Sequence, residues 1–375
     1  MAGAFRNTAA RWASSLAVAF LLVTTAFAQH YTRTDLTTDS SSVSAAPNVD
    51  PNLVNAWGLA RSTSSPWWIS DNGKGLTTLY DGTGAIVPLV VTIPPPKGEQ
   101  GPSAPTGAVR NYTTEFEVAP GQPAFFIFVT EDGTISGWNP NVNPLEAVLK
   151  VNRPKHAIYK GVALATTSKG ARLYATNFQT GNVEVYDGHF HRRHEEERFR
   201  DNDGDRGPDR GGLPPHFVPF GIQNVGGNLV VTYAQRDPGS TDENHGAGLG
   251  FVRIFDLHGD VLVRVEHGPF LNAPWGIALA PGDFGPFSHR LLIGNFGDGT
   301  IAAFNAFTGR FEGNLLDSSG AALSIDGLWA LSFAGDPAKN GSPTDLYFTS
   351  GPNDENDGVF GKLTATASEQ RGNTE

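Results

Sequence analysis

A short phrase that ends in glycine and continues with apolar residues recurs six times along this chain of 375 residues. Successive glycines lie 49 to 60 residues apart, a period typical of four-stranded propeller blades and too long for leucine-rich or ankyrin repeats. A β-rich run follows each phrase, so every copy predicts an inner and a second strand. The six phrases are Trp57-Gly58-Leu59-Ala60, Thr106-Gly107-Ala108-Val109, Lys160-Gly161-Val162-Ala163, Phe220-Gly221-Ile222, Trp275-Gly276-Ile277-Ala278 and Asp326-Gly327-Leu328-Trp329.

The composition excludes most other folds. With 45 glycines and 26 prolines, no segment after residue 28 is left for a long core helix, which rules out helical bundles and a regular βαβ array. The chain has no cysteine, so neither disulfides nor thiolate metal sites are expected. The net charge of −11 supplies no basic surface for a nucleic acid.

We therefore predict an all-β fold, a six-bladed β-propeller over residues 29–365. A glycine in each innermost strand permits close backbone approach around a crowded axis. The sixth copy has only three strands by about Leu363, so Tyr31-Thr-Arg-Thr-Asp-Leu-Thr37 is expected to supply its outer strand and close the ring. A β-sandwich and a seven-bladed ring with one degenerate blade are the alternatives.

The ends of the chain carry separate signals. Residues 1–28 have Arg6 and Arg11, an apolar run and the small residues Ala26 and Ala28, which predict a signal peptide cleaved before Gln29. A membrane anchor is the alternative interpretation. No later apolar run is long enough to span a bilayer, and residues 366–375 form a polar tail. We expect a secreted or periplasmic monomer without a membrane span in the mature chain.

A family resemblance appears in the fifth phrase and its sequel. Ala273-Pro-Trp-Gly-Ile-Ala-Leu-Ala-Pro-Gly282 and Arg290-Leu-Leu-Ile-Gly-Asn-Phe-Gly-Asp-Gly-Thr-Ile301 resemble the NHL repeat and the gluconolactonase-like propellers. The run from Asn52 to Gly361 is more similar still to a family of secreted bacterial propellers without an assigned reaction. The resemblance implies the fold and leaves the activity open, because propellers carry unrelated functions.

A charged insertion, residues 189–212, separates the third and fourth copies. Asp201, Asp203 and Asp205 imitate the start of a calcium loop, but Arg206 stands where such loops require glycine. Its three histidines could collect a transition metal. A charged surface tract is the interpretation that we favour for this segment.

A column of polar residues ends the six second strands. Its Asp and Asn members, Asp71, Asn177 and Asn295, fall on alternate blades and would approach the axis from three directions. Carboxylate and amide oxygens suit a hard cation, so these residues predict a possible Ca²⁺ site at the channel mouth. The alternative is that each side chain binds the backbone of its own turn.

Two functions follow from different classes. The first is an exported binding or scaffold propeller that holds a glycan, peptide or protein with its channel and with loops 234–250 and 351–357. The second is a Ca²⁺-dependent lactonase or esterase, in which Asp326 or Lys160, beside the repeated glycines, would move protons. We prefer the first, because most acidic clusters of the sequence lie in its loops.

Overall fold

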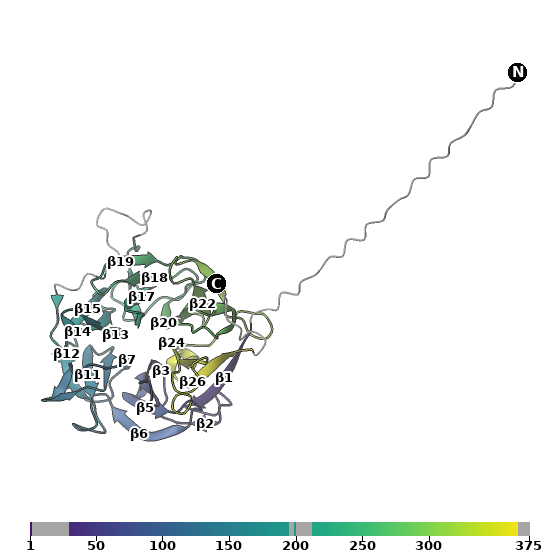
Figure 1. The fold of residues 1–375 in the computed structure, drawn as a ribbon. Coiled ribbons are helices and arrows are strands. Elements are labelled where there is room, and N and C mark those ends of the chain that lie inside the picture. The colour runs from purple at the N-terminus through teal and green to yellow at the C-terminus, as the bar shows by residue number, and fades with distance from the viewer. Residues whose placement is uncertain (2–29, 195–198, 200–211, 367–375) are drawn as a thin grey trace.

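Six β-sheets surround a central axis in the computed structural model (Figure 1). The structure describes residues 1, 30–194, 199 and 212–366. The predicted all-β, six-bladed propeller is confirmed, and each sheet is one blade. The predicted signal peptide, all but Thr366 of the polar tail, and the aspartates Asp201, Asp203 and Asp205 lie outside the described residues.

Blades one to three follow one another along the chain, and each runs outward from its innermost strand. Blade one contains β3 (Ala56–Ala60), β4 (Trp67–Asp71), β5 (Leu76–Tyr80) and β6 (Ile86–Thr92). Blade two contains β7 (Pro105–Arg110), β10 (Phe126–Thr130), β11 (Thr134–Trp138) and β12 (Val148–Asn152), with the small hairpin β8 (Glu117–Ala119) and β9 (Gln122–Pro123) inserted. Blade three contains β13 (Tyr159–Thr167), β14 (Gly170–Asn177) and β15 (Asn182–Asp187).

Blades four to six complete the circle. Blade four contains β16 (Phe217–Val225), β17 (Asn228–Gln235), β18 (Gly250–Phe255) and β19 (Val261–Arg264). Blade five contains β20 (Pro274–Leu279), β21 (Leu291–Asn295), β22 (Ile301–Phe304) and β23 (Phe311–Asn314). Blade six contains β24 (Leu328–Phe333), β25 (Leu346–Ser350), β26 (Val359–Ala365), β1 (Tyr31–Thr38) and β2 (Asn48–Val49). A short helix, α1 (Pro352–Glu355), follows β25.

The core lies between the blades rather than inside any one of them. All five residues are buried in each of the second strands β4, β10, β21 and β25. Each blade lies between two neighbours, so both faces of such a strand are covered. This explains why these strands are almost continuously apolar instead of alternating. The outer strand β6 lacks that cover and is mostly exposed or half-buried.

Glycines of the inner strands allow the blades to approach one another around the axis. A Cβ on Gly58 would lie 2.2 Å from the Thr106 carbonyl oxygen of blade two, and one on Gly221 would lie 2.2 Å from the Trp275 carbonyl oxygen of blade five. Real side chains do not tolerate such distances to backbone atoms. The close approach predicted from the repeat is confirmed for these strands.

The sixth phrase corrects one detail of this alignment. Gly327 precedes β24 and has a φ of 63°, like Asn55 (47°) and Ala273 (44°) before the inner strands of blades one and five. The position that corresponds to Gly221 is Ala330, because the backbone N–H of each residue donates a hydrogen bond to a threonine hydroxyl of the second strand. Gly327 therefore provides a left-handed turn. Its close contact is with Gly351 of its own blade, where a Cβ would lie 2.1 Å from the carbonyl oxygen, and not with the neighbouring blade.

Alanine substitutions at Gly221 and Gly161 should destabilise the protein to different extents, because the two glycines differ in how closely the neighbouring backbone approaches them. Gly221→Ala should cost about 3 kcal/mol of unfolding free energy and Gly161→Ala about 1 kcal/mol, because the new Cβ meets backbone at 2.2 Å in the first case and at 3.0 Å in the second. Urea-induced unfolding of both variants measures the difference. Equal losses would contradict this account of the inner strands.

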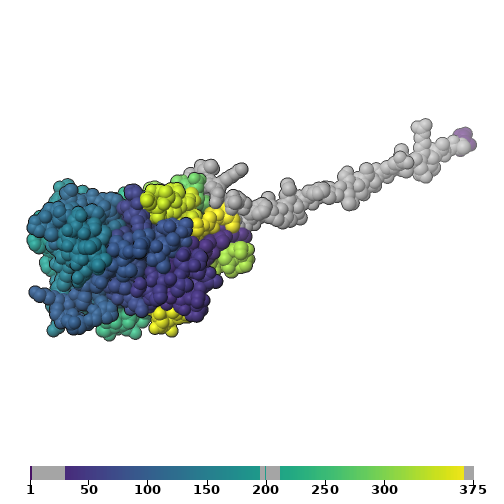
Figure 2. All heavy atoms as spheres, turned by 90° about the horizontal axis from the view of Figure 1, so that it is seen from below, coloured from purple at the N-terminus to yellow at the C-terminus, as the bar shows by residue number. Residues whose placement is uncertain are grey.

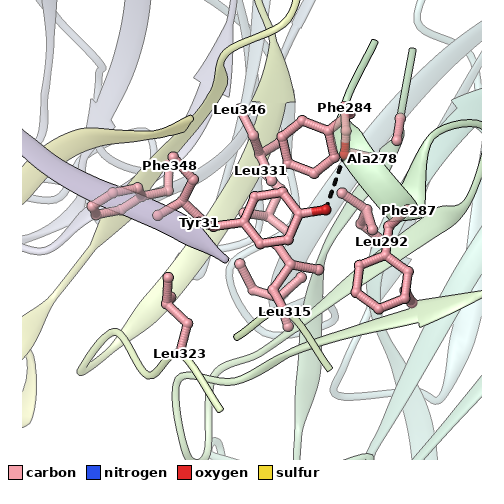
Figure 3. Close-up of a cluster of buried hydrophobic side chains, with 14 of the residues drawn as sticks. Tyr31, Ala278, Phe284, Phe287, Leu292, Leu315, Leu323, Leu331, Leu346 and Phe348 are labelled. Atoms are coloured by element: carbon pink, nitrogen blue, oxygen red, sulfur yellow. Dashed lines mark hydrogen bonds between the residues drawn. The ribbon is translucent and has the colours of Figure 1, made fainter. Parts of the chain in front are cut away.

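The N-terminal strand closes the ring, as predicted. β1 pairs antiparallel with β26 from Tyr31 opposite Ala365 to Thr38 opposite Val359, with one bulge. Figure 2 shows the purple N-terminal segment against the yellow C-terminal strands. The ring of Tyr31 lies in the buried cluster between blades five and six, and its hydroxyl donates a hydrogen bond of 2.9 Å to the Phe284 carbonyl (Figure 3).

Candidate functional site

The six inner strands each carry a register shift near their first residues. The shift falls between Ala56 and Leu59 in β3, at Lys160 in β13, and between Pro274 and Gly276 in β20. A bulge of this kind re-aims a side chain. The residues at the six shifts form what we call the axial ring: Trp57, Thr106, Lys160, Phe220, Trp275 and Trp329. The end of the propeller where the inner strands begin is called the upper face.

Stacked aromatic side chains fill the axis at this level. The rings of Trp57 and Trp329 stack with centroids 3.6 Å apart, and Phe296 stacks on the other side of Trp329 at 3.8 Å. Both tryptophans are buried. The indole N–H of Trp275 donates to the carbonyl of Lys160 at 3.0 Å, while that of Trp57 is buried without a partner. The axis is therefore closed by a rigid aromatic layer.

Lys160 is the charged member of the axial ring and is 1% exposed. Its Nζ lies 2.6 Å from Glu131 Oε1, 3.6 Å from Asp242 Oδ1 and 3.9 Å from Glu243 Oε2. The ammonium also faces the ring of Trp57 at 5.1 Å. Burial by itself lowers the pKa of Lys160, but the carboxylates of Glu131 and Glu243 outweigh it and keep the pKa above its ordinary value. The side chain is a permanent cation.

Hydrogen bonds extend this ion cluster across the upper face. Glu131 accepts a hydrogen bond of 2.9 Å from Asn72 Nδ2. Asn55 Nδ2 donates to Asn72 Oδ1 at 3.2 Å and to Glu355 Oε2 at 2.6 Å. In the loop between β17 and β18 of blade four, His245 Nε2 lies 3.7 Å from Glu243 Oε1. We call the connected side chains the axial network: Asn55, Asn72, Glu131, Lys160, Asp242, Glu243, His245 and Glu355.

Besides Lys160, two members of the axial network have raised pKa values. Burial, reinforced by the charge of Glu243, raises the pKa of Glu355 to about 7. The hydrogen bond with Glu243 raises the pKa of His245 above its ordinary value. A carboxyl group that titrates near neutral pH can accept or donate a proton under ordinary conditions.

The pKa of Glu355 predicts a pH-dependent stability. Because the folded pKa of about 7 exceeds the ordinary value of 4.5, folded Glu355 keeps a proton that the unfolded chain has released, so its contribution to stability falls as pH rises through this window. Glu355→Gln should remove that contribution. We expect the melting temperature of the native chain to decline more than that of the variant between pH 5 and 8. Parallel curves would contradict the shift.

The segment that carries Glu355 is held in an unfavourable conformation. Asn353, Asp354 and Glu355 have φ values of 56°, 52° and 65°. Three consecutive non-glycine residues in the left-handed region cost free energy, and such strain concentrates at binding and catalytic sites. Hydrogen bonds from Asn353 to Asp326 and to Asp357 hold the segment in place. They direct Glu355 toward Asn55.

The structure separates the two candidates for proton transfer. Lys160 lies at the centre of the axial network, as its place in the repeat indicated. Asp326 is exposed and accepts a hydrogen bond from the Asn353 backbone at 3.1 Å. Asp326 lies before β24, the inner strand of blade six, and is therefore not part of that strand. The residue that blade six contributes to the axial ring is Trp329, three residues further along the chain.

The residues expected to hold calcium are fully buried at the ends of their strands. Asn177 Oδ1 accepts three hydrogen bonds from backbone N–H groups of its own blade, and Asn295 binds the backbone of Asn272 and Phe270. Burial raises the pKa of Asp71 well above its ordinary value, which favours the uncharged acid. These contacts do not favour a cation among Asp71, Asn177 and Asn295, and that site stays a prediction.

The described residues contain no group of three or more His, Asp or Glu side chains arranged to hold a metal ion. At the upper face, the acidic side chains nearest the axis pair with the Lys160 ammonium. Asn55, Asn72 and Glu131 were not found from the sequence as site residues, whereas Glu243 and Glu355 lie in loops 234–250 and 351–357, which the sequence predicted to bind a partner. One signal was available: Glu131 directly follows a member of the polar column, Thr130.

Comparison with known proteins gives two extensive sequence relatives. No family model matches the chain. Uncharacterized protein R648 of Acanthamoeba polyphaga mimivirus is 31% identical over 331 residues, which cover 86% of this chain and 78% of the viral protein. Uncharacterized protein L690 of the same virus is 30% identical over 328 residues, which cover 85% and 82%. Because these relatives are viral, the bacterial origin implied by the resemblance is not supported.

Solved structures share the fold at much lower identity. A glucose dehydrogenase matches 89% of this chain and 100% of its own, with a TM-score of 0.51 and 12% identity. A gluconolactonase from Xanthomonas campestris matches 84% and 88%, with a TM-score of 0.45 and 14% identity. Such likeness shows the propeller fold alone. In the described part of the chain, no helix has the length and apolar character needed to cross a membrane.

Proposed function

Because the chain belongs to the family of the two uncharacterized mimivirus proteins, whose names give no activity, we propose from the axial network itself that the protein binds a small organic amine at its upper face. The observation that carries the proposal is the convergence of charged and amide side chains from five of the six blades on the axial network, beside the stacked aromatic rings of the axis. A fold that needed only a closed axis would not require this arrangement.

The charge balance of the axial network favours a cationic ligand. Glu131, Asp242 and Glu243 surround a single ammonium. Asp242 is 76% exposed and Glu131 is 25% exposed, so part of this negative charge faces the solvent. Glu355 adds a further carboxyl group. Carboxylates beside aromatic rings are the surroundings that protonated amines prefer.

Two loops supply much of the site. The loop between β17 and β18 contains Asp242, Glu243 and His245, and the loop between β25 and β26 contains Glu355. Loops on a rigid scaffold commonly carry binding residues. The predicted use of loops 234–250 and 351–357 is thus supported by the side chains that they contribute to the axial network.

Isothermal titration with spermidine, glucosamine and a dipeptide amine, each compared with glucose as a neutral probe, tests the proposal. At least one amine should bind, and Asp242→Asn should weaken it by about tenfold, because a charge-assisted contact contributes about 1.5 to 3 kcal/mol. Glu117→Gln, which removes an exposed carboxylate elsewhere, is the matched control. Failure of every amine to bind, or equal affinity of Asp242→Asn, would contradict the proposal.

A second candidate is hydrolysis of a lactone or ester, and the pKa of Glu355 near 7 is the observation in its favour. In this scheme the Glu355 carboxylate takes a proton from water, whose oxygen bonds to the carbonyl carbon. The ring C–O bond then breaks, and the proton passes to the leaving oxygen. Lys160 supplies the neighbouring positive charge.

This candidate has a direct assay. Hydrolysis of δ-gluconolactone and of a nitrophenyl ester should be lost in Glu355→Gln and retained in Glu117→Gln. Among the described residues, those of the axial network included, no three acidic or histidine side chains are arranged to hold a metal ion, and no step above uses one. Activity that requires Ca²⁺ and disappears with chelator would instead favour the cation predicted at Asp71, Asn177 and Asn295.

A further inference from the structure

The lower face, where the inner strands end, has a second opening that the axial network does not use. Two hollows of about 270 and 230 Å³ lie there, and both are lined by Arg61, Gln223 and Ser332. A narrower cavity of about 40 Å³ continues from them along the axis as far as Trp275. The aromatic layer separates this cavity from the upper face, so the lower mouth is a distinct compartment.

Two arginines of the lower mouth lack an acidic partner among the described residues. Arg61 donates to the carbonyl oxygens of Phe333 and Ser62. Arg110 donates through Nη1 to the carbonyl oxygens of Asn111 and Phe125. A guanidinium has five N–H donors, so both retain donors that these contacts do not use. Burial lowers the pKa of both arginines, which reflects the missing counter-charge.

Apolar side chains line part of each hollow. Leu279, Leu331 and Phe333 line one hollow, and Leu59 and Val109 line the other. Leu279 is 44% exposed, so its side chain is accessible to a ligand in this hollow. At about 30 Å³ per water-sized group, each hollow holds a chain of about eight heavy atoms.

We propose that the lower mouth binds an organic anion with an aliphatic chain, the anionic group lying on Arg61 and Arg110 and the chain lying on the apolar walls. Gln223 would donate its amide to the same anionic group, because it lines both hollows. Guanidinium groups bind carboxylates through paired hydrogen bonds. The chain has a net charge of −11, yet neither Arg61 nor Arg110 pairs with a carboxylate among the described residues. An anionic ligand would account for this.

Sodium octanoate is the probe, and isothermal titration with the full chain is the measurement. Octanoate should bind at least tenfold more tightly than octan-1-ol, which has the same chain without the charge, and than acetate, which lacks the chain. Its affinity should fall as salt is raised, since ions screen the arginines. Equal binding of octan-1-ol and octanoate, or no binding of octanoate, would overturn the proposal.

Gln223→Glu is the decisive variant, because it keeps the size of the side chain and introduces one negative charge. It should reduce octanoate affinity at least tenfold. Arg110→Gln should do the same, but Arg110 also packs over the ring of Phe125, so its loss could unsettle the fold. Gln179→Glu, on the exposed upper side of blade three, is the matched control and should leave the affinity unchanged. Unchanged affinity in Gln223→Glu would overturn the assignment of the anionic group to this mouth.

Discussion

Replacement of Lys160 by methionine should lower the free energy of unfolding by about 3 kcal/mol. Methionine preserves most of the side-chain volume against Trp57 and removes only the ammonium. Glu243, whose side chain is 4% exposed, and Glu131 would then be left near the axis without a positive partner. An uncompensated buried charge costs more than the ion pair contributes. Unfolding in urea, followed by tryptophan fluorescence, measures the loss.

A second substitution distinguishes charge from packing. In the Lys160→Met background, Glu243→Gln should restore part of the lost stability, because it removes the stranded charge and keeps the shape of the side chain. Lys150→Met is the control, since Lys150 is exposed on an outer strand, and it should change stability by less than about 0.5 kcal/mol. A Lys160→Met variant as stable as Lys150→Met would show that the ion cluster is not a structural element.

The inner strands were predictable because their requirement is local. A residue that must approach the next blade has to be small, so Gly58 and Gly221 mark their positions in the sequence without any knowledge of the fold. The same logic located Lys160, which directly precedes Gly161. It failed in blade six, where Ala330 satisfies the requirement and Gly327 serves a turn. Because the small residue at this position of blade six is alanine and not glycine, the glycine repeat did not identify it.

The rest of the axial network could not be predicted, because its acids come from loops that do not repeat. Glu243 and Glu355 approach Lys160 only once the ring is closed and both loops fold over the axis. No regular spacing in the sequence indicates that these two glutamates lie near Lys160. The converse holds for Asn177, whose repeated position suggested a ligand, while its amide binds the turn that follows β14.

Loss of the Tyr31 ring should have the largest effect among single changes in the closing strand. Tyr31 is 1% exposed, lies 4.8 Å from the ring of Phe284 between centroids, and packs in the cluster that joins blades five and six (Figure 3). Tyr31→Ala should cost about 3 to 5 kcal/mol of unfolding free energy, as for other buried aromatic truncations. Tyr31→Phe should cost only about 1 kcal/mol, because it keeps the ring and removes the hydrogen bond to the Phe284 carbonyl.

The relative losses of stability in these variants test the role of β1, the strand that joins the first residues of the propeller to the last. Arg33→Ala, at an exposed position of β1 that pairs with Asp35, is the control and should change stability by less than about 1 kcal/mol. Deletion of residues 30–38 should exceed even Tyr31→Ala, since it exposes the whole edge of β26 along with the cluster below it. If the deleted chain kept its melting temperature, the ring would be held by the other five blade contacts, and the pairing of β1 with β26 would not be what closes it.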